Sequence, residues 1–310
     1  MARIHARLTL SVLLLFAPAL PALANDSSLN PGAHGPEPLD IRDGRESLIR
    51  MVEEELTFHF GKWQTRVHAR FVFENTSADS TVRQLSGFPD DSVEGVYPEV
   101  QPYRLHDWEV EEFDRRQLHS SPIADMKTRI DGKPVASSLR FGFVASTDEA
   151  PWGWVAADTV TGVRVRWYVV ELVIPPKSRV TLERSYRARN GHQGMVGSHF
   201  QYLTLTGGPW QGTIGRLTAH VILEDGLTVD DLVWYEGEYD PWSMGTYPPR
   251  EEWRVEGRKR LSLIWTDFDP RLDVRKHQLG LAWTSMEPED SRAWHGERFS
   301  SRWWPWHWFE

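Results

Sequence analysis

Alternation of apolar and polar residues is the strongest regular pattern along the chain. Between residues 63 and 74 the odd positions are mostly apolar and the even positions polar, with Trp63 opening the apolar series and Phe73 closing it. A period of two is typical of a β-strand that buries one face and exposes the other to water. Residues 179–189 and 216–224 repeat the pattern, so we expect three long strands of this kind.

Residues 162–174 combine alternation with a nearly continuous apolar run, which Pro175 and Pro176 close. Because proline cannot donate to a strand ladder, this stretch predicts a strand that ends there after passing from a sheet edge into a core. Shorter strands are expected at residues 54–60, 139–144, 200–206 and 261–265. The turn residues between the expected strands are Asp131-Gly132, Gly207-Gly208 and Asp225-Gly226.

Helical periodicity is scarce outside residues 107–118 and the stretch after Arg275. We therefore predict an all-β fold, an antiparallel β-sandwich. The sandwich would occupy residues 51–190, and residues 191–270 would form either a second, smaller β-lobe or a continuation of it. Residues 25–50, rich in Pro, Gly, Asp and Ser, would be an extended lead-in, and residues 271–310 a Trp-rich C-terminal tail.

The first 24 residues have the pattern of a secretory signal peptide. Arg3 and Arg7 form a basic start, residues 8–16 are apolar, and Ala22-Leu23-Ala24 is a small-x-small cleavage site. An uncleaved membrane anchor is the alternative, but Pro18 and Pro21 interrupt a stretch that would need about 20 apolar residues. The pattern predicts export to the periplasm or the medium, with no transmembrane span left after cleavage.

Composition narrows the classes of partner and of chemistry. The chain has 44 Asp+Glu against 35 Lys+Arg, a net charge of −9, and no Cys. An acidic surface repels nucleic acid, so we exclude nucleic acid as a partner. The absence of Cys excludes disulfides, a Cys-liganded zinc site and a cysteine nucleophile, so the core alone must hold an exported fold.

Candidate binding residues gather in a Gly-rich segment at residues 191–197. It contains His192 and Gln193 and is followed by His199, and these three are candidate ligand-binding residues. The same two histidines are the closest pair among the 12 His, at seven residues apart. That spacing does not build a local metal site, although distant histidines could still converge in the fold. We predict no metal site, and we also expect no cofactor.

A second candidate binding group is Asp267 with Asp269, close to Trp265. A glycosidase needs two carboxylates about 5 to 10 Å apart across the sugar, commonly beside aromatic side chains. A calcium site at Asp90, Asp91 and Glu94 would follow from clustered carboxylates, although no twelve-residue calcium loop is present. Dinucleotide-binding glycine motifs and a nucleophile elbow are also absent from the sequence, so we assign no catalytic residues and favour a protein that is not an enzyme.

The C-terminal tail is dominated by tryptophan. Its last residues include Trp303, Trp304, Trp306 and Trp308. Tryptophan is favoured at protein interfaces and at membrane interfaces. The tail is therefore a candidate partner-docking segment, with a membrane-interface anchor and a cover for a hydrophobic sheet edge as alternatives.

Three stretches carry a family resemblance: residues 67–77 with the following Gly87-Phe88-Pro89-Asp90, residues 130–135, and residues 200–215. Together they resemble a family of bacterial exported proteins known only as a domain of unknown function, whose members begin with Asn-Asp-Ser after the signal peptide, as Asn25-Asp26-Ser27 does here. The first stretch is also similar to the start of inter-alpha-trypsin-inhibitor-type β-sandwich domains, which are adhesion or scaffolding modules. The resemblance implies a β-rich exported protein and supplies no catalytic residues.

The residues of these stretches also have a structural interpretation of their own. Asn75-Thr76-Ser77 would end a strand by satisfying backbone groups locally, and Gly87-Phe88-Pro89 would form a bend that buries a ring. Trp210, between Pro209 and Gly212, would fill the core where the chain reverses.

Two functions are compatible with these patterns. The first is a non-catalytic exported protein that binds or scaffolds something in the cell envelope, with an envelope protein or a glycan as partner. The second is a carbohydrate-binding or carbohydrate-active protein that uses exposed tryptophan and paired carboxylates. Burial of the tryptophans would remove support for the second.

Overall fold

The computed structural model describes residues 27–30, 37–38, 47–90, 123–147, 150–156, 162–192, 197–204, 207–234, 245–270 and 278–284. These residues are mostly in strands, as the alternating pattern predicts, and they form three sheets. The all-β prediction is therefore confirmed.

The largest sheet has eight strands in the order β15-β16-β14-β3-β4-β11-β6-β7. Their bounds are β3 Ile49–Phe60, β4 Gln64–Asn75, β6 Ile123–Ile130, β7 Lys133–Val135, β11 Arg179–Arg189, β14 Ile214–Leu223, β15 Arg254–Glu256 and β16 Arg260–Phe268.

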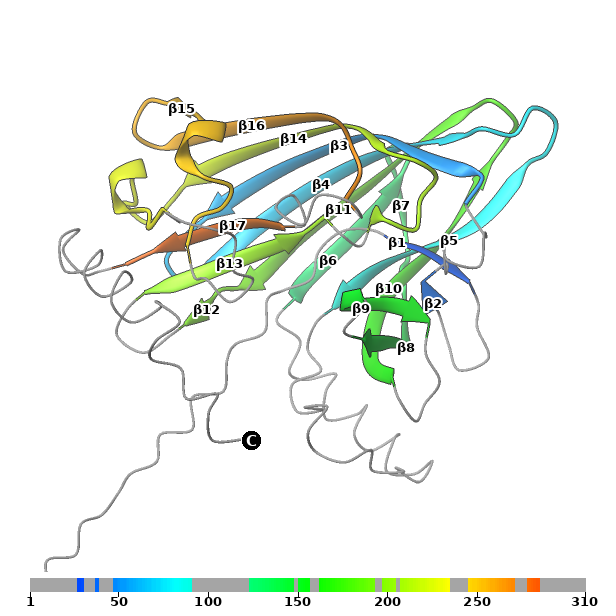
Figure 1. Ribbon diagram of the computed structural model, residues 1–310, viewed down its shortest axis with the longest axis horizontal. Coiled ribbons are helices and arrows are strands. Elements are labelled where there is room, and N and C mark those ends of the chain that lie inside the picture. Colours follow the sequence, from blue (N-terminus) through cyan, green and yellow to red (C-terminus); the bar gives the residue numbers. More distant parts are fainter. Residues whose placement is uncertain are drawn as a thin grey trace, which may run out of the picture.

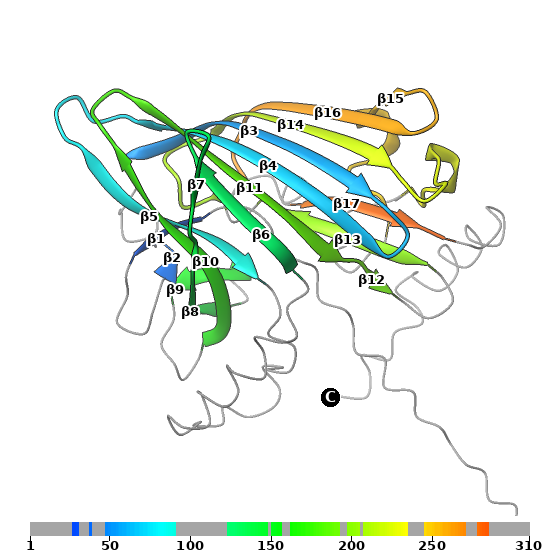
Figure 2. The same ribbon diagram turned by 180° about the vertical axis from the view of Figure 1, so that it is seen from behind.

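Two smaller sheets lie on one side of the eight-stranded sheet (Figures 1 and 2). The six-stranded sheet contains β1 Ser27–Asn30, β2 Glu37–Pro38, β5 Val82–Asp90, β8 Ser138–Thr147, β9 Ala150–Ala156 and β10 Gly162–Ile174. The three-stranded sheet contains β12 Gly191–His192, β13 Ser198–Leu203 and β17 Gln278–Trp283. Two short 3₁₀ helices, η3 Val229–Asp231 and η4 Arg250–Glu252, lie in the connections.

The buried face of β3 shows how the sequence builds the core. Ile49 and Met51 point inward from odd positions, whereas Leu56, Phe58 and Phe60 point inward from even positions. The pairing of β3 with β4 shifts register between Met51 and Glu53. The shift corresponds to one extra residue in β3. Because of this residue, the inward-facing positions change from odd to even numbers, and the same face of the strand stays buried.

Buried aromatic side chains fill the space beneath the large sheet. Phe58 packs against Phe200 and Tyr202 of the three-stranded sheet, with ring centroids 5.5 Å apart in each pair. Phe73 packs on Trp210 at 4.4 Å, which places Trp210 in the core as expected. The large sheet and the three-stranded sheet therefore share one core.

Arg184 connects the large sheet to the six-stranded sheet. Its side chain is fully buried on β11. Nη1 donates to Thr128 Oγ1 at 2.9 Å and to Ser137 Oγ at 2.8 Å, and Nη2 donates to the carbonyl oxygen of Tyr168 on β10 at 3.1 Å. A single guanidinium thus satisfies polar groups of both sheets where water is excluded.

Asn75 holds the corner where the chain passes from the large sheet to the six-stranded sheet. Its Oδ1 accepts the backbone N–H of Ser77 at 2.9 Å, which is the local bond expected from the sequence. Its Nδ2 also donates to the carbonyls of Ser80 and Ile174, each at 2.8 Å. The corner is therefore fixed by contacts distant in sequence as well as by the local turn.

Several strands agree closely with the sequence analysis. The bounds of β10 and β11 are those expected, and β4, β8, β13, β14 and β16 overlap the expected segments. Asp131-Gly132 forms the tight turn between β6 and β7, with φ of 49° and 73°. These positive values are those of a two-residue hairpin turn.

Other expectations need correction. The helical periodicity after Arg275 does not extend through residues 278–283, which form β17 and pair with β13. Phe88 is buried as expected, but it lies within strand β5 rather than at a bend. The prediction of an antiparallel sandwich also misses one pairing, because β14 runs parallel to β3.

The strands between residues 191 and 270 belong to two different sheets. β14, β15 and β16 continue the large sheet, whereas β12 and β13 belong to the small three-stranded sheet. The lead-in of residues 25–50 contributes strands β1 and β2 and the first residues of β3.

A candidate ligand-binding site at the β3–β4 turn

Among the described side chains, the most exposed aromatic one lies in the turn between β3 and β4. Trp63 has 67% of its surface exposed. Of the other tryptophans whose side chains are described, Trp167, Trp210, Trp253 and Trp265 are buried and Trp234 and Trp283 are partly buried. The turn lies at the end of the large sheet where β3, β11 and β14 end and β4 begins (Figure 1).

The backbone of this turn is held by side chains from three other segments. Asn190 Nδ2 donates to the carbonyl of Gly61 at 2.8 Å, and its own backbone N–H donates to the carbonyl of Trp63 at 3.1 Å. The Lys62 carbonyl accepts Ser198 Oγ at 2.6 Å, and Asp225 Oδ2 accepts the Lys62 N–H at 3.0 Å. Since each of its three residues is bonded to another segment, the turn is preorganised.

The buried side of the turn is closely packed. A Cβ at Gly61 would lie 2.5 Å from Asp225 Oδ2 and 3.1 Å from the carbonyl oxygen of Gln64, so only glycine fits there without displacement. Thr65, the next inward residue, donates from Oγ1 to Asn190 Oδ1 at 2.7 Å. Asn190 is 2% exposed, and its side-chain donor and acceptor are both used.

Trp283 extends the site onto the three-stranded sheet. Its Nε1 donates to Ser198 Oγ at 2.6 Å and lies 3.3 Å from the carbonyl oxygen of Lys62. The Lys62 ammonium lies 5.3 Å from the centroid of the Trp283 ring, within the range of a cation–π interaction. Lys62 is thus held between the two sheets, next to Trp63.

Charged side chains surround the turn. Glu224 Oε1 contacts His59 Nδ1 at 3.0 Å and the guanidinium of Arg66. Arg189 is exposed and lies opposite Gln64 in the β4–β11 pairing. Within the described residues, neither Lys62 nor Arg189 makes a salt bridge.

The predicted residues of the Gly-rich segment lie next to this site. Gly191 and His192 form β12, which pairs with Ser198 and His199 at the start of β13, so the described ends of the segment are a strand pair rather than a loop. A Cβ at Gly191 would lie 2.4 Å from His199 Cε1, so the imidazole packs directly on the Gly191 backbone. Gln193 and the His192 side chain lie outside the described residues.

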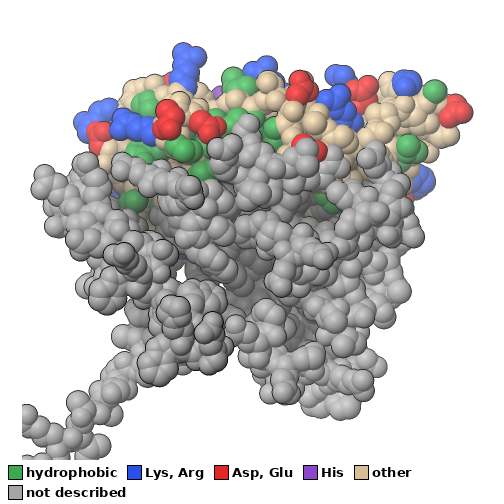
Figure 3. Space-filling model, viewed as in Figure 1, with side chains coloured by type: hydrophobic (Ala, Val, Ile, Leu, Met, Phe, Trp, Pro, Cys, Tyr) green, Lys and Arg blue, Asp and Glu red, His purple; other side chains and the backbone are tan. Residues whose placement is uncertain are grey.

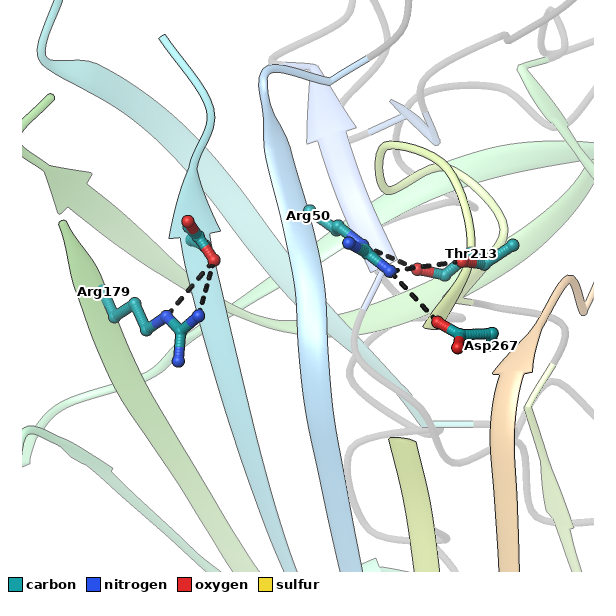
Figure 4. Close-up of polar contacts among 5 residues, drawn as sticks. Arg50, Arg179, Thr213 and Asp267 are labelled. Atoms are coloured by element: carbon teal, nitrogen blue, oxygen red, sulfur yellow. Dashed lines mark hydrogen bonds and ion pairs between the residues drawn. The ribbon is translucent and has the colours of Figure 1, made fainter. Parts of the chain in front are cut away.

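The second predicted group lies at the other end of β3 (Figure 4). The exposed Asp267 forms a 3.4 Å ion pair with Arg50 Nη2, and Arg50 also donates to the carbonyl and the hydroxyl of Thr213, each at 3.3 Å. Trp265 is 6% exposed and donates from Nε1 to Glu252 at 3.0 Å, so it offers no aromatic surface beside this carboxylate. Asp269 is partly buried one residue beyond β16.

The structure does not bring the two predicted groups together. Arg50 is near the start of β3 and Phe60 at its end, a separation of roughly 30 Å at about 3.3 Å per residue. A small ligand therefore cannot bridge the two groups. Among the described residues, no cluster of three or more His, Cys, Asp or Glu side chains has a geometry suited to a metal ion.

The sequence pattern placed Trp63 on the buried face of a strand, and the structure corrects this. The chain leaves the sheet between Phe60 and Gln64, so the alternation that holds for β4 does not extend to Trp63. Gly61, directly before Lys62 and Trp63, was the available signal for a turn, because glycine commonly marks the close approach of backbone segments.

Some predicted features lie outside the described residues. They are the calcium ligands Asp91 and Glu94, the expected helix at residues 107–118, and the candidate docking residues Trp303, Trp304, Trp306 and Trp308. For Asp90 the structure describes only the backbone, at the end of β5.

The described surface shows no segregation of charge in the view of Figure 3. In the view of Figure 3, basic and acidic side chains stand side by side over the described part of the surface. No helix within the described ranges has the length and apolar character needed to cross a membrane.

Comparison with known proteins finds a similar fold but no related sequence. No family model and no curated protein matches the sequence. Among solved structures, the chain is similar to a protein from Legionella pneumophila subsp. pneumophila str. Philadelphia 1, described as a "putative nutrient binding protein". The TM-score is 0.53 with 15% identity, over 89% of this chain and 73% of the other. The two chains therefore share an all-β fold.

Proposed function

We propose that this chain is a non-catalytic binding protein that is exported and acts in the cell envelope, with its ligand site at the β3–β4 turn. The observation that carries the proposal is the combination of an exposed Trp63 with a turn backbone fixed by Asn190, Ser198 and Asp225. Binding sites gain affinity when their groups are ordered before the ligand arrives. An exposed indole on a fixed backbone meets that requirement.

Two further observations support the proposal. The pattern of residues 1–24 is that of an exported protein. The Legionella protein with a similar fold is named as a binding protein, which favours binding over catalysis for this chain as well. A similar fold does not by itself establish a function. The proposal therefore rests on the exposed Trp63 and the fixed backbone of the turn.

The proposal is tested by affinity capture from native envelope extract. The mature protein, the variant Trp63→Ala and the control Ile264→Ala are immobilised at equal density, and retained small molecules, glycans and proteins are identified by mass spectrometry. Ile264 is a matched control because it is also a large exposed apolar side chain, 54% exposed, on the same sheet. We expect a ligand that the wild type and the control retain and that Trp63→Ala loses.

Two results would overturn the proposal. In the first, all three proteins retain the same molecules, so that the turn has no role. In the second, the mature protein turns over a glycan or an ester, and this activity disappears when one particular acid or histidine is replaced.

Carbohydrate binding is a second candidate, and the exposure of Trp63 is the observation that favours it. Aromatic faces and planar polar side chains are groups that sugar-binding sites commonly combine. Gln64 follows Trp63 in the chain, Arg189 lies opposite Gln64 in the β4–β11 pairing, and both are exposed. A carbohydrate-active enzyme built on Asp267 and Asp269 receives less support, because Trp265 beside them is buried.

The Trp-rich tail is proposed as a separate docking segment for an envelope protein. Capture by the full chain is compared with capture by a chain that ends at Ser301, before the Trp303–Phe309 cluster. Loss of one protein partner on shortening is the expected result. An identical set of protein partners would assign the tail to covering the fold instead, and loss of membrane association alone would assign it to the lipid interface.

A further inference from the structure

We propose that the ligand bound at the β3–β4 turn is an anionic saccharide, with a sugar ring stacked on Trp63 and its acidic group paired with the neighbouring Lys62. This inference rests on the proposed function and names the class of ligand for the same site. It follows from three features of the turn: one exposed ring, an excess of basic side chains, and a backbone with little freedom.

The first feature is the ring. Trp63 exposes two thirds of its surface at the end of the sheet, and the neighbouring Gln64 is also exposed. The apolar face of a pyranose can cover an indole, while its hydroxyl groups remain at the edge for polar partners. Gln64 supplies both a donor and an acceptor at that edge.

The second feature is the local charge. The whole chain has 44 acidic against 35 basic residues, but among the described side chains around the turn the basic ones outnumber the acidic ones. Lys62, Arg66 and Arg189 are basic, and Glu224 and Asp225 are acidic.

The two acidic side chains already have partners. Glu224 contacts Arg66 and His59, and Asp225 accepts the backbone N–H of Lys62. Within the described residues, the charges of Lys62 and Arg189 are not matched by any carboxylate within 4.0 Å. A carboxylate or sulfate on the ligand would supply a negative charge for Lys62, through charge-assisted hydrogen bonds.

The third feature is the order of the basic group. The Lys62 backbone is bonded through both its N–H and its carbonyl, and its ammonium lies over the Trp283 ring at 5.3 Å. A lysine on an open surface would lose about 2 kcal/mol of rotamer freedom on pairing. Because Lys62 is already positioned, less of that freedom remains to be lost when an anion binds.

A lipid surface is the competing explanation for an exposed tryptophan beside a lysine. The preorganised backbone favours a small ligand with fixed geometry, and among the tryptophans whose side chains are described Trp63 alone is exposed. The membrane is therefore treated as an outcome of the test.

The test is isothermal titration calorimetry of the mature full chain with three oligosaccharides of equal length. They are an oligogalacturonate, which carries carboxylates, a sulfated glycosaminoglycan fragment, and a neutral cello-oligosaccharide. The two acidic probes separate uronate from sulfate as the source of the charge. We expect one of them to bind more tightly than the neutral probe, and binding to weaken as salt is raised.

Variants connect binding to the turn. Trp63→Ala should weaken binding by at least about tenfold, the loss typical of a buried aromatic anchor. Trp63→Phe should restore part of that loss, and Lys62→Gln should weaken binding and reduce its dependence on salt. Ile264→Ala is the control and should bind as the wild type does, and circular dichroism should show the same strand content for all variants.

Three outcomes overturn the inference. They are equal binding of the neutral and acidic probes, no binding of any probe, and binding that Trp63→Ala leaves unchanged. Trp63-dependent binding to phosphatidylglycerol-containing vesicles without saccharide binding would assign the turn to a lipid surface. If the saccharides fail while envelope capture still depends on Trp63, the ligand class is wrong and the proposed binding function stands.

Discussion

The turn is preorganised chiefly through Asn190, so the substitution Asn190→Asp should disturb it without changing side-chain volume. In the wild type, Asn190 Nδ2 donates to the Gly61 carbonyl at 2.8 Å, and Asn190 Oδ1 accepts the Thr65 hydroxyl at 2.7 Å. The substitution keeps the acceptor but replaces the donor with an oxygen. Two acceptors would then face each other at hydrogen-bond distance inside a buried site.

The expected cost follows from these contacts. Losing one buried hydrogen bond and leaving the Gly61 carbonyl unsatisfied should cost about 2–4 kcal/mol of unfolding free energy. For a chain of this size, each kcal/mol lowers the melting temperature by about 2 °C, so Asn190→Asp should melt about 4–8 °C lower at pH 7. Lowering the pH toward 4 should recover part of the loss, because a protonated carboxyl can donate to the Gly61 carbonyl again.

The assay combines thermal denaturation with hydrogen exchange. Amides of the peptide around Gly61 and Trp63 should exchange faster in the variant, while amides in the middle of β4 and β11 keep their protection. Gln64→Glu is the matched control, since it introduces the same charge one residue from Trp63 at an exposed position. A variant that melts with the wild type and shows unchanged exchange at the turn would refute the claim that Asn190 holds it.

Three further substitutions test how the sheets are joined and how the site is packed. Arg184→Met should lower stability by about 2 kcal/mol or more, since it removes the hydrogen bond to the Tyr168 carbonyl of the six-stranded sheet and those to the hydroxyls of Thr128 and Ser137, and urea denaturation that gives the wild-type midpoint would contradict this. Tyr202→Phe removes the hydroxyl that donates to buried Glu54 at 2.8 Å, and we expect about 1–3 kcal/mol of destabilisation by the same measurement. Gly191→Ala should displace the imidazole of His199, with a cost of about 1–3 kcal/mol; unchanged imidazole NMR shifts would argue against the close contact.

The strands were predictable from the sequence wherever one face is buried throughout. β10 and β11 have the expected bounds because their patterns are uninterrupted from the first residue to the last. β3 was expected only from residue 54, although it begins at Ile49. The register shift near Val52 reverses the parity of the buried positions, so a period of two cannot continue across it.

The arrangement of the strands required the structure. β17 lies far along the chain from β13, and their pairing depends on contacts that no local pattern encodes. The parallel pairing of β14 with β3 is also non-local, since the two strands are more than 150 residues apart. Pairing partners in a sheet depend on how the faces pack together, which alternation alone does not determine.

One of the segments singled out from the sequence lies next to the candidate site. The Gly-rich segment led to His192 and His199, and the structure places the start of β13 beside the turn through the bond from Ser198 to Lys62. Trp63 was missed, because an apolar residue in phase with a strand pattern is usually buried. Trp63 differs from the inward residues of β4 only in its place, because it belongs to the three-residue turn that precedes the strand.

Oxidative footprinting of tryptophan tests the central claim most directly, since it reports on Trp63 in the unmodified full chain. The full chain is labelled in the presence and absence of concentrated native envelope extract, and each tryptophan is quantified by mass spectrometry. The account predicts that Trp63 is oxidised readily in the free protein and becomes protected in the extract, while Trp210 in the core is unreactive in both. Continued oxidation of Trp63, with protection appearing on another surface, would contradict it.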